Sequence, residues 1–183
     1  MQIITNVFLI LTQNLVFSAC FGIPSLTKSA KSAKHLALTG ALTMVFCAFC
    51  TGLLAALRGM LPTVHLVWMT VFGVMIVCAA DLAAVLPMMR HDRLSAYIPQ
   101  VHLAAFSSAV LGIMLKSGAV SFGAGFRTGL EAGAGYLLCC LMLAAVLPEI
   151  NSKKMPASVR GWRGLLLYAG VIALAVSCMT EKG

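Results

Sequence analysis

The stretch QNLVFSACFGIP, residues 13–24, places glutamine and asparagine inside a run of apolar residues. A similar stretch, QVHLAAFSSAVLG, occupies residues 100–112, where glutamine and histidine precede small residues and a glycine. Both lie in segments apolar enough to cross a lipid bilayer. Polar groups at that depth need partners within the protein, because the hydrocarbon core offers no water.

The composition indicates an integral membrane protein. Of the 183 residues, 61% are hydrophobic and 10% are charged, whereas soluble domains carry about 25% charged residues. A globule of this size cannot bury so large an apolar excess, so the lipid bilayer is expected to be its solvent. The net charge of +8 does not indicate nucleic-acid binding, because nine of the thirteen Lys and Arg residues lie in three short loops.

Six segments are long enough to span the membrane, which takes about 20 apolar residues in a helix. They cover roughly residues 2–22, 36–57, 64–87, 97–115, 125–147 and 162–179. The loops between them are short and contain Gly and Pro. The sequence therefore predicts an all-α membrane protein with one integral membrane domain over residues 1–183.

The two polar stretches indicate an inverted repeat. Residues 1–87 and 88–183 each contain three predicted spans, so the second half enters the membrane in the opposite sense. The stretches fall in the first span of each half, as do the interrupted helices of inverted-repeat transporters. We therefore expect two inverted three-helix repeats with interrupted first and fourth helices.

The distribution of basic residues predicts the orientation. The first, third and fifth loops hold nine Lys and Arg residues, and the opposite side holds four. By the positive-inside rule, these three loops are cytoplasmic and both termini lie outside.

The polar and small residues of the two stretches form the candidate site, predicted near the middle of the membrane. They are Gln13, Asn14, Gly22, Pro24, Gln100, His102, Ser107, Ser108 and Gly112. The side chains are expected to point inward and to cap half-helices where Gly22 and Gly112 interrupt the spans. Hydrogen bonding between helices is an equally good explanation of such residues.

Asp81 lies deep in the third span, where a carboxylate costs about 2.5–3.5 kcal/mol on insertion scales. Three roles remain open: a proton or cation relay, a hydrogen bond to a broken helix, or contact with the headgroups. Glu131 follows Arg127 by four residues, which predicts a structural ion pair on one helix face.

The cysteines and glycines favour packing roles. Cys47 and Cys50 form a CxxC pair within an apolar span, without a second pair at similar spacing, so helix packing is preferred over a metal or redox site. The glycines of FGAGF and EAGAGY, in the fifth span, predict close helix contact. No nucleophile–base set or phosphate loop appears, so the chain alone is not expected to be a complete enzyme.

Several segments together resemble a known family. They are QNLVFSACFG, IPQVHLAAFSSAVLG, TGLEAGAGYLLCCLMLAAVLPEI and VRGWRGLLLYAGVIALAVSCM. The chain resembles the small six-span membrane subunits of the Rnf/Nqr electron-transport complexes, on the RnfA/NqrE branch. Asp81 lies close to an acidic position in the third span of that family, which suggests a link to cation movement.

The sequence departs from the family at the positions of two cysteines. These cysteines help to hold a [2Fe–2S] cluster between the subunit and its homologous partner, and their positions align with Pro24 and Ser108. Iron–sulfur clusters need thiolate ligands. Cys20 could be a displaced ligand, but the second stretch offers no thiol. We therefore expect no cofactor bound by this chain alone, with flavins and iron–sulfur clusters on partner subunits.

The resemblance implies an accessory, non-catalytic subunit of a Na⁺- or H⁺-translocating oxidoreductase complex in the bacterial cytoplasmic membrane. The implied partners are a homologous six-span subunit and subunits that bear flavin and iron–sulfur centres. The alternative is a small standalone transporter or channel subunit, in which Asp81, His102 and the Gln and Asn side chains line the substrate path.

Overall fold

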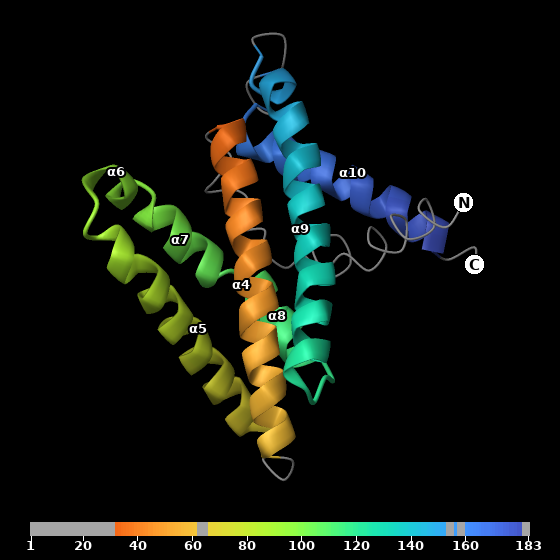
Figure 1. Ribbon diagram of the computed structural model, residues 1–183. Coiled ribbons are helices and arrows are strands. Elements are labelled where there is room, and N and C mark those ends of the chain that lie inside the picture. Colours follow the sequence, from red (N-terminus) through yellow and green to blue (C-terminus); the bar gives the residue numbers. More distant parts are fainter. Residues whose placement is uncertain (1–31, 62–65, 153–155, 157–159, 181–183) are drawn as a thin grey trace.

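The structure is a computed structural model that describes residues 32–61, 66–152, 156 and 160–180. Regular structure in these residues is entirely helical (Figure 1). The helices are α4 (Ala33–Met60), α5 (Leu66–Met88), α6 (Asp92–Ser95), α7 (Ile98–Ala105), α8 (Ser108–Lys116), α9 (Phe122–Ile150) and α10 (Trp162–Thr180). The predicted features at Gln13, Asn14, Cys20, Gly22 and Pro24 lie outside the described residues.

Four helical segments are long and apolar enough to cross a membrane: Ala33–Met60, Val67–Met88, Ile98–Lys116 and Phe122–Ile150. The third of them combines α7 and α8. The chain is therefore a multi-pass, all-α membrane protein, as the composition predicts. The sixth predicted span corresponds to α10, in which Arg163–Ile172 forms a shorter apolar helix.

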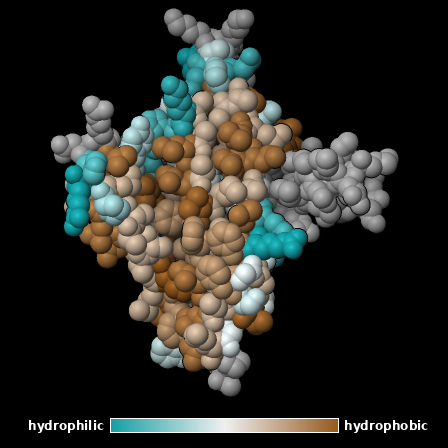
Figure 2. Space-filling view, in the orientation of Figure 1, coloured by the Kyte–Doolittle hydropathy of each residue, from teal (hydrophilic) through white to brown (hydrophobic). Residues whose placement is uncertain are grey.

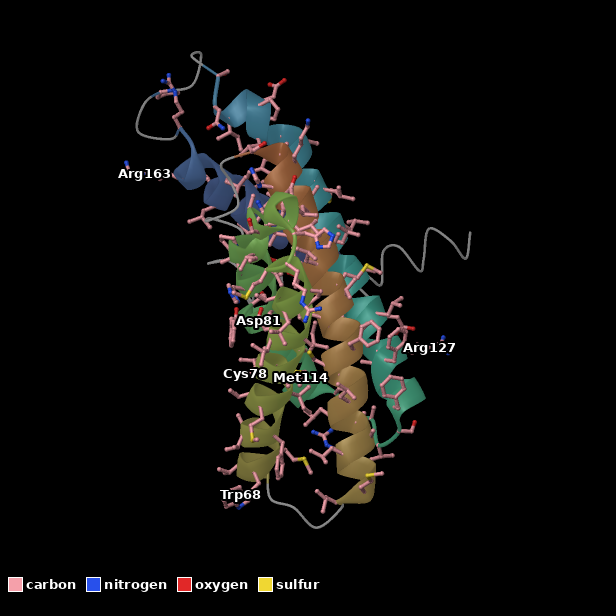
Figure 3. All side chains as sticks on the ribbon, turned by 60° about the vertical axis from the view of Figure 1, so that its left-hand side comes forward. Trp68, Cys78, Asp81, Met114, Arg127 and Arg163 are labelled. Carbon is pink, nitrogen blue, oxygen red and sulfur yellow. The ribbon has the colours of Figure 1, made fainter. Side chains whose placement is uncertain are left out.

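The outer surface of the helices is apolar. Figure 2 shows hydrophobic residues over the middle of the molecule, with hydrophilic residues toward the upper end and in a separate patch on the right-hand side. On α5 the exposed side chains include Val67, Met75 and Leu82. Trp68 is also exposed and lies near the start of this helix (Figure 3). Such a surface suits contact with lipid, because exposed apolar area on this scale is unfavourable in water.

Helices α4 and α9 run antiparallel and form the closest packing in the structure (Figure 1). Gly125, Gly129 and Gly133 of α9 recur every fourth residue and face α4. A Cβ atom added to Gly133 would lie 2.8 Å from the Cα atom of Met44, and one added to Gly129 would lie 2.9 Å from the Cα atom of Ala48. The close helix contact predicted from the glycine spacing is confirmed.

Two groups of buried apolar side chains fill the spaces between the helices. One joins α4, α5, α7 and α8 and includes Cys47 and Cys50. The other joins the start of α4 with α8, α9 and α10 and includes Cys139 and Cys140. All four thiols are buried among apolar residues and form no disulfide, which agrees with the packing role predicted for them.

The end of α8 is fixed by a residue from α4. Arg58, in the last turn of α4, donates a hydrogen bond from Nη1 to the carbonyl oxygen of Ser117, the residue that follows α8. The last carbonyl groups of a helix have no partner within the helix. Arg58 thus supplies a donor to a helix end and holds α8 against α4.

Candidate functional site

The fourth predicted span is broken into two helices. Helix α7 ends at Ala105, Phe106 and Ser107 leave the helical conformation, and α8 begins at Ser108. Ser107 has an extended backbone (φ −68°, ψ 134°), and its Oγ accepts a hydrogen bond from the backbone N–H of Ala109 at 3.3 Å. Figure 1 shows the junction about halfway along α4.

The position of this break differs from the one expected. Gly112 lies inside α8 and does not interrupt it, so the prediction that this glycine ends a half-helix is wrong. One glycine costs a helix only about 1 kcal/mol relative to alanine, which neighbouring packing can offset. Serine is a favoured N-cap residue, and Ser107 therefore sets the start of the second half-helix.

The two neighbouring serines have different environments. Ser107 is buried, as predicted. Ser108, also predicted to point inward, is exposed on the described helices, and its place in the site stays a prediction. Successive residues of a helix diverge because the α-helix has 3.6 residues per turn.

Asp81 and His102 form an ion pair between α5 and α7. Asp81 is buried, with 6% of its surface exposed, and lies in the upper half of α5 (Figure 3). Its Oδ2 atom is 2.7 Å from Nδ1 of His102. His102 belongs to the first half of the broken helix, so one of the three roles left open for Asp81, a hydrogen bond to a broken helix, is present.

The pair is asymmetric. The second carboxylate oxygen of Asp81, Oδ1, is buried and has no hydrogen-bond partner among the described residues. The side chain of His102 is 48% exposed. A carboxylate can accept several hydrogen bonds, so Asp81 keeps an unused acceptor in an apolar environment while its partner faces outward from the described helices.

Gln100 connects the same half-helix to α4. Its Nε2 atom contacts Nδ1 of His35, near the start of α4. The Gln100 Oε1 atom is buried without a partner in the described part of the chain. Helix α7 is thus held on one side by Gln100 and on the other by His102, which agrees with the alternative that polar residues join helices within the membrane. No pattern in the sequence distinguishes His35.

The donor atoms at the break do not fit an iron–sulfur cluster. Ser108, which aligns with a cluster cysteine of the resembled family, has a hydroxyl in place of the thiolate that such clusters use. Helices α7 and α8 contain no cysteine. Within the described residues, no group of three or more His, Cys, Asp or Glu side chains could hold a metal ion.

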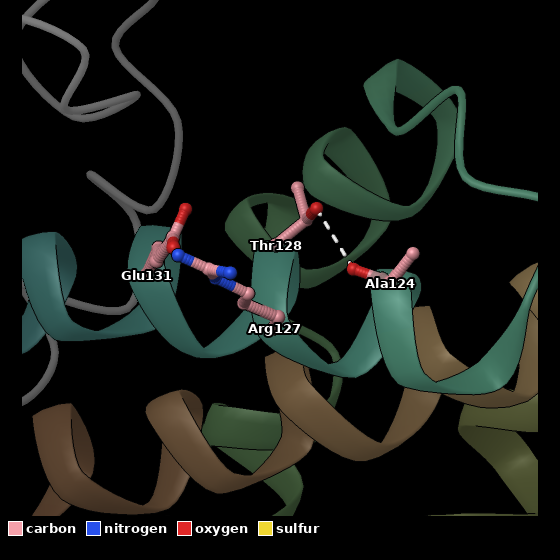
Figure 4. A network of polar contacts seen from close by, with 4 residues as sticks. All are labelled: Ala124, Arg127, Thr128 and Glu131. Carbon is pink, nitrogen blue, oxygen red and sulfur yellow. Dashed lines mark hydrogen bonds and ion pairs between the residues drawn. The ribbon is translucent and has the colours of Figure 1, made fainter.

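Arg127 and Glu131 form the ion pair that their spacing predicts. Nε of Arg127 lies 3.0 Å from Oε1 of Glu131, and their side chains are 83% and 58% exposed. Beside them, Thr128 donates a hydrogen bond to the carbonyl oxygen of Ala124 at 3.0 Å (Figure 4). Both side chains lie on the exposed side of α9, and the structural role of the pair stays a prediction.

Replacing Glu131 with glutamine should lower the free energy of unfolding by no more than about 0.5 kcal/mol, because exposed i, i+4 pairs contribute little. The check is the thermal unfolding midpoint in detergent at low and high salt. A loss well above that magnitude would mean that Arg127 lies in lipid and needs its partner.

Replacing His102 with alanine should lower the free energy of unfolding by about 1–3 kcal/mol, because the buried carboxyl of Asp81 loses its partner. Adding Asp81→Leu should recover part of that loss, since an apolar pair often replaces a buried ion pair without cost. A double-mutant cycle on denaturant unfolding measures the coupling. Additive effects of the two substitutions would show that the residues do not interact.

The fold and the site define a class: a multi-pass α-helical membrane protein with an ionisable pair beside a broken helix. No protein-family model matches the sequence, and no curated protein is significantly similar to it.

Proposed function

We propose that the chain is an accessory membrane subunit of an ion-translocating oxidoreductase complex of Rnf/Nqr type. In this proposal, electron transfer through other subunits is coupled to Na⁺ or H⁺ movement, and this chain contributes part of the ion path. The observation that carries the proposal is the Asp81–His102 pair beside the broken α7–α8 segment. The sequence resemblance provides the redox context.

The chemistry of the pair suits an ion path. Ionisable side chains within membrane spans are costly, and they commonly mark ion pathways or proton relays. Discontinuous helices place polar groups at membrane depth, where transporters bind their ions. Asp81 supplies a buried carboxylate, and the half-exposed ring of His102 supplies a group through which an ion can reach it.

The proposal also includes the parts of the architecture that precede and follow the described spans. The chain would have six spans in two inverted repeats, and its first span would be interrupted near Gln13, Asn14, Gly22 and Pro24. A homologous six-span subunit would meet it at the two breaks. Flavin and iron–sulfur centres would reside on partner subunits, and the family cluster at the shared interface would be lost here.

The proposed location is the bacterial cytoplasmic membrane. Helix α4 begins, α5 ends, α7 begins and α9 ends at the same end of the bundle (Figure 1). Arg90 and Arg160 lie in connections at this end, whereas Arg58 and Lys116 lie at the opposite end. Over the whole sequence, the first, third and fifth loops hold nine Lys and Arg residues and the opposite side holds four. By the positive-inside rule, this excess supports a cytoplasmic location for the first of these ends.

Purification through a tag on this chain in mild detergent tests the proposal. Mass spectrometry should recover a homologous membrane subunit together with flavoprotein and iron–sulfur partners. A membrane protein unrelated in sequence and carrying the same tag is the control. Recovery of this chain alone, as a monomer or homodimer, would contradict the proposal.

A standalone transporter is the second candidate, because the exposed ring of His102 gives the pair a possible access route without any partner. The test is ion movement by the purified chain in sealed vesicles. Transport by the chain alone would support this candidate and contradict the complex-subunit proposal.

A further inference from the structure

We infer that the Asp81–His102 pair is a proton-binding site and does not bind Na⁺. The use of that proton for coupling rests on the proposed function, but the binding chemistry depends only on the residues described here. The sequence leaves two coupling ions open, Na⁺ and H⁺, and this chemistry favours H⁺.

Among the described residues, the surroundings of Asp81 offer few oxygen ligands for Na⁺. Alkali and alkaline-earth cations prefer oxygen ligands, and membrane sites supply them from unwound backbone. Helix α5 is continuous past Asp81, and the residues one turn away on the same face are Val77 and Val85, both buried and apolar. The group that meets the carboxylate is the nitrogen of an imidazole ring.

Carbonyl groups at the helix break also accept hydrogen bonds from backbone N–H groups. The carbonyl of His102 accepts a hydrogen bond from Phe106 N–H at 3.0 Å, and that of Ser107 accepts one from Val110 N–H at 3.0 Å. The carbonyl of Ala104 accepts one from Ser107 N–H at 3.3 Å. The broken helix therefore satisfies much of its own backbone and does not direct a ring of free carbonyl oxygens at Asp81.

The pair itself suits a proton. The 2.7 Å separation of Nδ1 and Oδ2 is typical of a charge-assisted hydrogen bond. Asp81 keeps a buried acceptor in Oδ1, and the side chain of His102 is half-exposed on the described helices. Histidine is the side chain whose unperturbed charge change falls between pH 5 and 8.

The described neighbours bring few other titratable groups to the pair. Helix α4 contributes Cys47 and Cys50 to the apolar cluster that includes Val77 and Val85, and α7 contributes His102. The members of this cluster from α8 are Val110, Ile113 and Met114, which do not titrate, with Leu111 packed against it. Within the described helices, Asp81 makes one ion pair, that with His102.

One proton therefore changes the charge of this region. With neutral imidazole and ionised carboxylate, the pair carries one negative charge. Uptake of a proton from water gives imidazolium and carboxylate, or imidazole and carboxylic acid, and the pair becomes neutral. Release returns the same proton.

Infrared difference spectroscopy of the purified full-length chain tests the inference. The carboxylic-acid stretching band is followed as pH is varied, once in sodium chloride and once in choline chloride. The wild-type chain should show a pH-dependent band whose midpoint is the same in both salts. Asp81→Asn should lose the band, whereas the control variants Glu131→Gln and Glu149→Gln should keep it.

His102→Gln should move the midpoint by about one pH unit or more, a tenfold change in proton affinity. A midpoint that depends on Na⁺, or a band retained in Asp81→Asn, would overturn the inference. So would the absence, in the same wild-type spectra, of both a titrating carboxylic-acid band and a titrating imidazolium band. The sodium comparison needs no variant and stands even where a substitution impairs folding.

The experiment separates this inference from the proposed function. It uses the isolated chain and reads proton binding directly. A chain without redox partners could still show the sodium-independent band, and a chain purified within a complex could fail to show it.

Discussion

The Gly129→Leu variant is expected not to fold. A Cβ atom at Gly129 would meet the backbone carbonyl of Cys47 and would lie 2.9 Å from the Cα atom of Ala48. Both are backbone atoms of α4, so no side-chain rotation can make room, and the two helices must separate. Overpacking against side chains costs about 1–3 kcal/mol. A leucine against rigid backbone should exceed this and should abolish the monodisperse, helical protein.

A graded series isolates the cause of this effect. Gly129→Ala should lower the free energy of unfolding by about 1–3 kcal/mol. The matched control is Gly123→Ala on the same helix, where an added Cβ meets no atom within 4 Å. The control should leave stability unchanged or raise it, because alanine favours helix by about 1 kcal/mol over glycine. Size-exclusion elution and thermal unfolding in detergent provide the measurements. Equal behaviour of the Gly129 and Gly123 variants would refute the close packing of α4 and α9.

The Asp81→Asn variant is expected to assemble normally but to lose coupled ion movement. Asparagine has nearly the shape of aspartate and can still hydrogen-bond to His102, so the free energy of unfolding should change by about 1 kcal/mol. The neutral amide of asparagine cannot take up or release a proton, and it cannot neutralise the charge of a bound cation. In the proposed complex, membrane vesicles should continue electron transfer, while the ion gradient formed per electron falls to the background level.

The control for this prediction is Glu131→Gln, which also removes one carboxylate but from the exposed pair on α9. It should leave both electron transfer and ion movement intact. An Asp81→Asn complex that builds the wild-type gradient would remove Asp81 from the ion path and leave its pair with His102 as a purely structural contact.

The amino-acid sequence predicts the membrane spans of the described region because span formation depends on local composition. A segment of about 20 apolar residues crosses the bilayer as a helix whatever its neighbours. The four spans of the described chain lie close to the segments expected, within a few residues at most ends. The glycine spacing on α9 similarly predicts close contact, since small residues at every fourth position form one face.

The site could be predicted only in part. Asp81 and His102 were each selected because a polar group in an apolar span needs an explanation, yet nothing in the sequence joins them. They are 21 residues apart and on different helices. The break was expected at Gly112, but it occurs at Phe106 and Ser107, because the capping hydroxyl and local packing outweigh the low helix propensity of one glycine.

The sequence by itself thus determines that this is a helical membrane protein, and it identifies which polar residues are unusual. The spans are helical because, in lipid, each span must satisfy its own backbone hydrogen bonds. The tertiary structure alone decides which side chains meet. The Asp81–His102 pair, the contact of Gln100 with His35 and the choice of α4 as the partner of α9 arise from how helices pack. Such contacts depend on the whole bundle, so no local pattern can specify them.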